Sequence, residues 1–199
     1  MKVSPRYPST AALQRKLEAL ARTRPTFERT GLTRTPGPET LAGYDHDYHA
    51  CILGEGQRVF DAARELMRQW RVFPTPWCVP EPVNAPLRAG TDLVVMMHIF
   101  GLWWWSPSRV AYVIDEPQRF GFAYAPLPGH PETGEERFLL ERLPDGRVRY
   151  SIRAYSHPSN LLTRLGYYVI RTYQRRFVRD SMAQLRRLVG ERLEAAVPA

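Results

Sequence analysis

The chain has 199 residues, of which 44% are apolar and 12% are aromatic, and its formal net charge is +8 at pH 7. This length and composition predict one globular domain and exclude a disordered chain. The longest apolar run, residues 93–105, is interrupted by His98 and Gly101 and is too short to span a bilayer.

The first half of the chain predicts two helices and one strand. Residues 9–22 carry leucines at helical spacing after a Ser-Thr cap, which predicts a short helix. A connector rich in Thr, Pro and Gly follows to about residue 43. Residues 44–53 alternate apolar and polar as a strand does, and after Gly54 and Gly56 an apolar stripe predicts a helix to about residue 70. We therefore expect an N-terminal helical extension with its connector over residues 1–43 and a folded domain over residues 44–195.

The second half predicts an antiparallel sheet and a long helix. Five prolines between residues 74 and 86 predict an extended segment. Strands are expected at residues 92–100, 102–105 continuing irregularly to 109–115, 119–125, 135–142 and 147–155. A helix is expected over residues 160–193, with an apolar stripe of Leu162, Leu165, Val169, Tyr173 and Phe177. Only this helix is large enough to cover the concave face of such a sheet, so we expect a curved antiparallel sheet wrapped around it.

The most informative segment is residues 120–138. Aromatic and small residues alternate from 120 to 125, a loop rich in Pro and Gly follows, and the strand period resumes at Glu136. This phase places Glu136 on the same face as Phe138, where a carboxylate needs a partner or a functional reason. Glu136 is either a polar anchor or general base in a cavity, or a structural carboxylate that pairs with an arginine or caps loop amides. The loop before it carries His130, Glu132 and Glu135 as further candidates.

Several stretches of this sequence resemble one protein family. They are TFERTGLT (26–33), LGEG followed by Phe60, Ala63 and Trp70, GLWWWSPSRVAYVIDE (101–116), FGFAY with LPGHPETGEERF (120–138) and IRAYSHPS (152–159). Over most of residues 26–180 they are similar to an uncharacterised bacterial and plant family, the domain of unknown function nineteen-ninety. The order of elements also resembles the helix-grip fold of START-like proteins. The resemblance implies an α+β, START-like helix-grip domain, and it implies no reaction.

A sheet that grips a helix leaves room for a pocket between the two, so we expect a mostly apolar small molecule to bind there. The expected lining residues are Tyr112, Phe122, Tyr124, Phe138, Tyr150 and Tyr173, with Glu136 as the polar group. In one alternative the cavity is an active site in which Glu136 and His130 perform acid–base chemistry. In another, side chains fill the cavity and the protein is an interaction module that docks through its basic C-terminal helix. The sequence predicts no cofactor and no metal site.

The positive charge is concentrated near the C-terminus, where residues 159–195 hold eight arginines and three acidic residues. Five of the arginines fall within a narrow arc of the predicted helix: Arg164, Arg171, Arg175, Arg179 and Arg186. Such an arc is either a solvated face or a basic ridge for weak contact with an anionic membrane surface. No RNA-binding motif accompanies it, which argues against a nucleic-acid partner.

Two observations bear on location. The N-terminus lacks an apolar signal core, which argues against secretion. Cys51 and Cys78 show no metal-binding or redox spacing, so both are interpreted as core thiols in a reducing compartment. We therefore expect a cytoplasmic protein.

Overall fold

The computed structural model describes residues 2–34, 41–159 and 161–195. Its helices are α1 (Thr10–Leu20), the 3-10 helix η1 (Leu32–Arg34), α2 (Gln57–Arg68), α3 (Leu161–Leu165) and α4 (Tyr167–Glu194). Its strands are β1 (Lys2–Ser4), β2 (Asp45–Glu55), β3 (Cys78–Glu81), β4 (Asp92–Ile99), β5 (Leu102–Glu116), β6 (Arg119–Pro126), β7 (Glu132–Arg142) and β8 (Arg147–Pro158). No helix in these ranges is long and apolar enough to cross a membrane.

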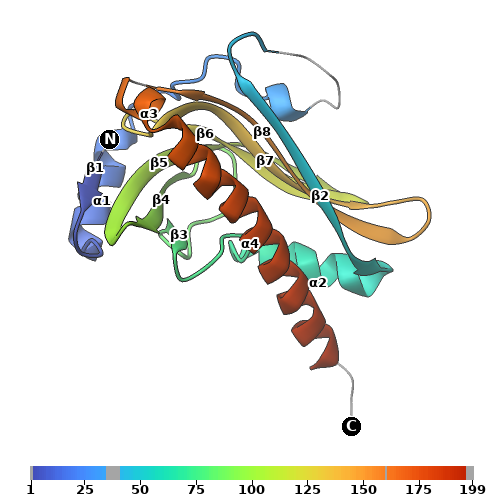
Figure 1. Ribbon diagram of the computed structural model, residues 1–199. Helices are drawn as coiled ribbons and strands as arrows, with labels where there is room; N and C mark the ends of the chain where they lie inside the picture. The colour runs from blue at the N-terminus through green and yellow to red at the C-terminus, as the bar shows by residue number, and fades with distance from the viewer. Residues whose placement is uncertain (1, 35–40, 160, 196–199) are drawn as a thin grey trace.

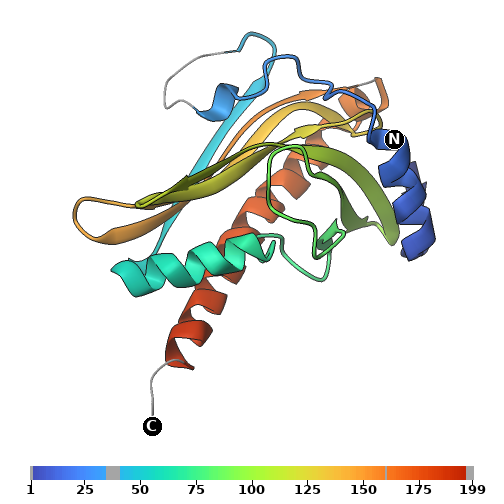
Figure 2. The same ribbon diagram turned by 180° about the vertical axis from the view of Figure 1, so that it is seen from behind.

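All eight strands form one antiparallel sheet. The strand order is β2-β8-β7-β6-β5-β4-β3, so β2 and β3 are the outer strands of this path, and β1 pairs with β5. The sheet curves, and α4 crosses its concave face next to α2 (Figure 1). The view from behind places α1 at the end of the sheet formed by β4 and β5 (Figure 2). The predicted fold, a curved antiparallel sheet around a long C-terminal helix, is confirmed.

The main hydrophobic core lies between the concave face of the sheet and helices α2 and α4. Phe60 and Met67 of α2, Phe122 and Phe138 of the sheet, and Phe177 of α4 are all buried in it. The rings of Phe122 and Phe138 stack across β6 and β7 with 4.9 Å between their centroids. Because aromatic side chains bury more area than most others, these rings supply much of the burial that holds α4 on the sheet.

The C-terminal helix differs from its prediction in two respects. Residue 160, its expected start, and the side chain of Leu162 lie outside the described residues, and Gly166 separates α3 from α4. Leu165 is 77% exposed and Val169 is 45% exposed, so this part of the predicted stripe is wrong. The buried face of α4 comprises Phe177, Ser181, Leu185 and Val189, at a spacing of four residues. The break at Gly166 interrupts the helical phase, and a pocket separates the first turns of α4 from the sheet.

A bulge in β5 changes which of its side chains face the core. The register between β5 and β6 shifts between Val110 and Tyr112. As a result Val110 belongs to the main core, whereas Tyr112 packs on the opposite face with Ile114 and Leu139. Regular alternation would place Val110 and Tyr112 on one face, because the side-chain period of a strand is two.

The segment before β2 is anchored to the convex face by a buried carboxylate. Glu135 is 2% exposed, and it accepts hydrogen bonds from the backbone N–H groups of Gly31 and Thr33, the latter at 2.8 Å, and from the Thr33 hydroxyl. Arg137, two residues further along β7, donates to the Thr33 carbonyl at 2.6 Å. Glu135 therefore has a structural role on the side of the sheet opposite to Glu136.

Replacing Glu135 with glutamine is expected to lower the free energy of unfolding by about 2–3 kcal/mol. The new amide nitrogen cannot accept hydrogen bonds, so N–H groups of Gly31 or Thr33 would be left buried without a partner. Urea denaturation measures this difference. The matched control is Glu18→Gln on the exposed face of α1, which should change stability by less than about 0.5 kcal/mol. Equal midpoints for the two variants would contradict the anchoring role.

Candidate functional site

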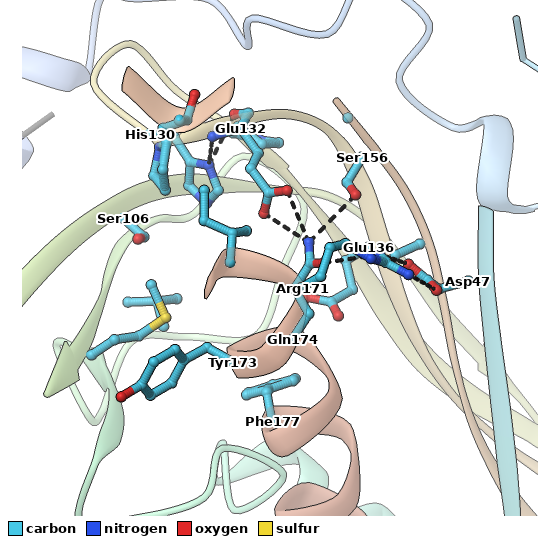
Figure 3. Close-up of a pocket in the computed structure, with 18 of the residues that line it drawn as sticks. Asp47, Ser106, His130, Glu132, Glu136, Ser156, Arg171, Tyr173, Gln174 and Phe177 are labelled. Atoms are coloured by element: carbon cyan, nitrogen blue, oxygen red, sulfur yellow. Dashed lines mark hydrogen bonds and ion pairs between the residues drawn. The ribbon is translucent and has the colours of Figure 1, made fainter. Parts of the chain in front are cut away.

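A pocket of about 400 Å³ lies between the concave face of the sheet and the first half of α4. Strands β2 to β8 and the loop at residues 130–131 form its walls, and α4 crosses it (Figure 3). Most lining side chains are apolar or aromatic, among them Val95, Met97, Trp104, Ile152, Tyr173 and Phe177. This volume is in the range of sites that bind small organic molecules.

The rest of the concave face is filled by the chain that follows α2. The ring of Phe73 lies 5.7 Å from that of Phe138 and 5.9 Å from that of Phe177. The side-chain amide of Gln184 in α4 donates to the carbonyls of Arg71 and Phe73 at 2.7 and 2.6 Å, which fixes this segment against the helix. The space between sheet and helix is thus packed at one end and hollow at the other.

The predicted lining residues divide accordingly. Tyr124, Glu136 and Tyr173 line the pocket. Phe122, Phe138 and Tyr150 lie in the packed core beyond it, where the Tyr150 hydroxyl is 2.9 Å from the Ser181 hydroxyl. Tyr112 lies on the opposite face because of the β5 bulge, and its hydroxyl is 2.7 Å from that of Thr33.

An exposed aromatic ring borders the pocket. Phe100 lies in the turn between β4 and β5 with φ 52°, and it is 73% exposed. Its ring meets that of Tyr173 edge to face, with 5.8 Å between the centroids. Both residues line the pocket, together with Val169. The turn and the first part of α4 therefore approach each other at the pocket wall.

Glu136 lies in the pocket as its strand phase predicts. Its carboxyl accepts a hydrogen bond from the hydroxyl of Tyr124, which is its cross-strand partner on β6. Burial raises the pKa of Glu136 to about 7, the Tyr124 hydrogen bond opposes this rise, and nearby Glu132 adds to it. Glu136 therefore changes its ionisation state near neutral pH and not near its usual pKa.

Glu132 is a second pocket carboxyl that the sequence marked only as a loop candidate. It is the first residue of β7, and its two oxygens accept from the side-chain amide of Gln174 at 2.9 and 3.0 Å. Burial raises the pKa of Glu132 to about 7, although the Gln174 hydrogen bond and Arg171 act against it. The sequence predicted that this strand begins at residue 135, whereas β7 begins at Glu132. A strand predicted from residue 132 would have placed Glu132 on the same face as Glu136, because every second side chain shares a face.

His130 also lines the pocket, and its ring is engaged by the loop. Its Nδ1 lies 3.0 Å from the backbone nitrogen of Glu132 and 2.9 Å from the carbonyl oxygen of the same residue. Burial lowers the pKa of His130 to about 4, so the ring is neutral at pH 7. Nδ1 accepts from the Glu132 N–H in one tautomer and donates to the Glu132 carbonyl in the other, and either bond fixes the turn before β7.

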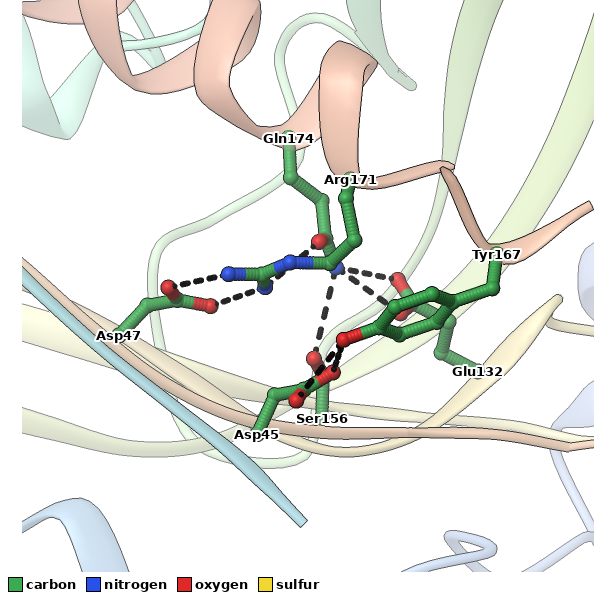
Figure 4. Close-up of polar contacts among 7 residues, drawn as sticks. All are labelled: Asp45, Asp47, Glu132, Ser156, Tyr167, Arg171 and Gln174. Atoms are coloured by element: carbon green, nitrogen blue, oxygen red, sulfur yellow. Dashed lines mark hydrogen bonds and ion pairs between the residues drawn. The ribbon is translucent and has the colours of Figure 1, made fainter. Parts of the chain in front are cut away.

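Arg171 points into the site instead of forming part of an external ridge. Its guanidinium binds both oxygens of Asp47 on β2, one at 2.7 Å, and donates to the side-chain oxygen of Gln174 at 2.9 Å (Figure 4). The hydrogen bonds from Arg171 lower the pKa of Asp47. Tyr167 donates to Asp45 on the same strand, with 3.0 Å to its nearer oxygen. These contacts join the start of α4 to β2, and the guanidinium of Arg171 is neutralised by its ion pair with Asp47.

Two features of the pocket are left without a partner of matching chemistry. Within the described part of the chain, Glu132 and Glu136 form no ion pair, and their hydrogen-bond partners are the neutral side chains of Gln174 and Tyr124. Arg171, which also lines the pocket, is paired with Asp47 instead. The hydroxyl of Ser106 on β5 lies buried in the pocket wall and has no hydrogen-bond partner among the described residues. Buried polar groups in folded proteins are nearly always hydrogen-bonded, so the Ser106 hydroxyl is one of a few exceptions among the described residues.

The site could also support proton transfer. A carboxyl with a pKa near 7 can act as a general base or acid at neutral pH. Glu136 has that property, and its direct hydrogen-bond partner is Tyr124. An acid–base pair of Glu136 with His130 would require the ring to exchange protons despite a pKa near 4.

Comparison with known proteins places the chain in a family. The profile of the family described as "Domain of unknown function (DUF1990)" matches residues 26–184. The chain belongs to this family. A UPF0548 protein of Dictyostelium discoideum is 35% identical over 161 residues, which cover 75% of this chain and 74% of the relative. A UPF0548 protein of Deinococcus radiodurans is 34% identical over 152 residues, which cover 71% of this chain and 77% of the relative. In Arabidopsis thaliana, UPF0548 protein At2g17695 is 29% identical and covers 67% and 68%.

Solved structures support the fold of this DUF1990 chain. The hypothetical protein jhp0584 from Helicobacter pylori has a TM-score of 0.50 and 11% identity, and the match covers 74% of this chain and 88% of that one. A conserved protein from Geobacillus kaustophilus has a TM-score of 0.51 and 10% identity, covering 74% and 96%. At this level of identity the likeness concerns the fold alone.

Proposed function

We propose that this DUF1990 protein is a START-like small-molecule-binding protein whose ligand is mostly apolar and lies in the pocket between the sheet and α4. The observation that carries the proposal is a hollow of about 400 Å³ with a largely apolar lining and a few inward polar groups. Ligand sites are typically built in this way, because apolar walls supply affinity and isolated polar groups orient the ligand. The neighbouring part of the concave face is tightly packed by Phe73, so the hollow is local.

Filling the pocket is the direct test of this function. Ala154 lies on β8 in the pocket wall, and Ala154→Phe would place a phenyl group in the hollow. Native mass spectrometry of the purified protein should reveal a bound small molecule in the wild type and its loss in the variant. The control is Ala19→Phe on the exposed face of α1, which should retain the molecule. Repeated absence of any bound mass from the wild type would favour an interaction module.

We further propose a cytoplasmic location and a weak contact with anionic membrane surfaces. The support for the contact is a set of exposed arginines: Arg175, Arg179 and Arg186 on α4, and Arg164 on α3. Arg175 also lines the pocket, Arg179 pairs with Asp180, and Arg186 donates to the Ile52 carbonyl. Arg171 is excluded from this surface by its pairing with Asp47. Attraction between such exposed charges and lipid is screened within about 10 Å at 0.1 M salt, so the contact would weaken as salt is added.

A further inference from the structure

We propose that the ligand of this pocket carries a basic nitrogen, and that the carboxyl groups of Glu132 and Glu136 bind it as a cation. This inference rests on the proposed ligand-binding function and specifies its chemistry. The pocket would take an aryl or alkyl amine with its apolar body against Trp104, Tyr173 and Phe177.

The argument begins with charge. Glu132 and Glu136 both line the pocket, and each retains part of its surface toward the hollow. Each is hydrogen-bonded by a neutral group, Gln174 or Tyr124, and by no cation among the described residues. Burying an ionised carboxylate is costly unless a positive charge accompanies it. A ligand ammonium would supply that charge.

The protein's own cations do not take this role in the observed arrangement. Arg175 also lines the pocket, but its side chain is exposed, and among the described residues it forms no ion pair with either carboxyl. The positive charge of Arg171 lowers the pKa of Glu132, but its guanidinium does not contact that carboxyl. The guanidinium donates hydrogen bonds to both oxygens of Asp47 and to the side-chain oxygen of Gln174. Figure 4 shows the guanidinium directed at Asp47, on the other side of Gln174 from Glu132. Asp45 and Asp47 add negative charge near Glu132, which makes the site more favourable for a cation.

The surrounding walls fit the rest of such a molecule. Aromatic rings attract cations and pack against flat apolar groups, and Tyr173 and Trp104 contribute rings to the pocket. The unpartnered hydroxyl of Ser106 is a second, independent sign of a ligand. Figure 3 shows it across the pocket from Glu136, where it could hydrogen-bond the far end of the molecule.

The test uses three probes with one carbon skeleton: 4-phenylbutylamine, 4-phenylbutan-1-ol and 4-phenylbutyrate. Isothermal titration calorimetry at pH 8 should give an affinity for the amine about tenfold or more above that for the alcohol, with the carboxylate weakest. In Glu132→Gln/Glu136→Gln the amine should fall to the level of the alcohol, whose own affinity should be unchanged. The control Glu18→Gln should keep the preference for the amine.

A second arm follows pH. The alkyl amine stays protonated from pH 5.5 to 8, whereas both carboxyls ionise over that range. Amine affinity should therefore rise with pH in the wild type and stay level in the double variant. Alcohol or carboxylate binding as tight as the amine would overturn the basic nitrogen and leave the binding function intact. If none of the three probes binds at millimolar concentration, the binding function itself is contradicted.

Discussion

Replacing Gly134 with alanine is expected to destabilise the protein by about 3 kcal/mol or more. Gly134 has φ 143°, a conformation that L residues rarely adopt, and it pairs with Ser156 in the β7–β8 ladder. A Cβ on Gly134 would collide with the backbone carbonyl of Tyr155. The two strands would have to separate next to Glu136, so both stability and the pocket should suffer. Urea denaturation measures the effect.

The matched control is a second glycine-to-alanine change, at Gly190 in α4. A Cβ there meets no atom within 4 Å, and the backbone is helical. Gly190→Ala should therefore stabilise the protein by up to about 1 kcal/mol, because alanine has the higher helix propensity. The two substitutions are chemically identical and are expected to act with opposite sign. A Gly134→Ala variant as stable as the wild type would contradict the described strand pairing.

Glu136→Gln is expected to stabilise the protein at pH 8 and to have little effect at pH 5. The folded chain raises the pKa of Glu136 from 4.5 to about 7, so the folded state holds its proton more tightly than the unfolded state. Stability from this group is present below about pH 4.5 and is lost as pH rises through 7. This rise in pKa corresponds to about 3 kcal/mol of folding free energy that is lost when the carboxyl ionises. Glutamine cannot ionise, so the variant should not lose this stability at pH 8.

The measurement is the difference in free energy of unfolding between variant and wild type across pH 5 to 8. Using the difference matters because His130 titrates in the opposite sense: its lowered pKa makes the folded state more stable as pH rises from 4 to 6.5. That contribution is common to both proteins and cancels. Glu18→Gln serves as the flat control. A loss of about 3–5 kcal/mol at pH 8 would instead identify Glu136 as part of a buried ion pair.

Most of the fold follows from local patterns in the sequence. Alternation located β6, β7 and β8, and helical spacing located α1, α2 and the C-terminal helix. The same alternation placed Glu136 in the pocket. These predictions succeed because a strand with one buried face constrains every second residue, and a helix on a sheet constrains every third or fourth.

The remaining differences arise where local patterns are interrupted or where distant residues decide. The bulge beside Val110 reverses the orientation of Tyr112, and the composition around it gives no sign of an extra residue. Gly166 breaks the helix and removes Leu165 from the core. Phe73 fills the space beside Phe138, and Arg171 turns inward because Asp47, 124 positions earlier, lies opposite it. Single-sequence periodicity contains no information on such long-range pairs.

The outer strands of the sheet determine how readily a second molecule could pair with its edges. A free strand edge can recruit a strand from a second molecule and so begin aggregation. At one edge β3 is only four residues long and contains Pro80, which has no N–H to offer to an incoming strand. At the other edge the first residues of β2 include Asp45 and Asp47, whose charges are held by the start of α4. The β3 edge is therefore a poor template for an incoming strand, and the β2 edge is protected only where the start of α4 contacts it.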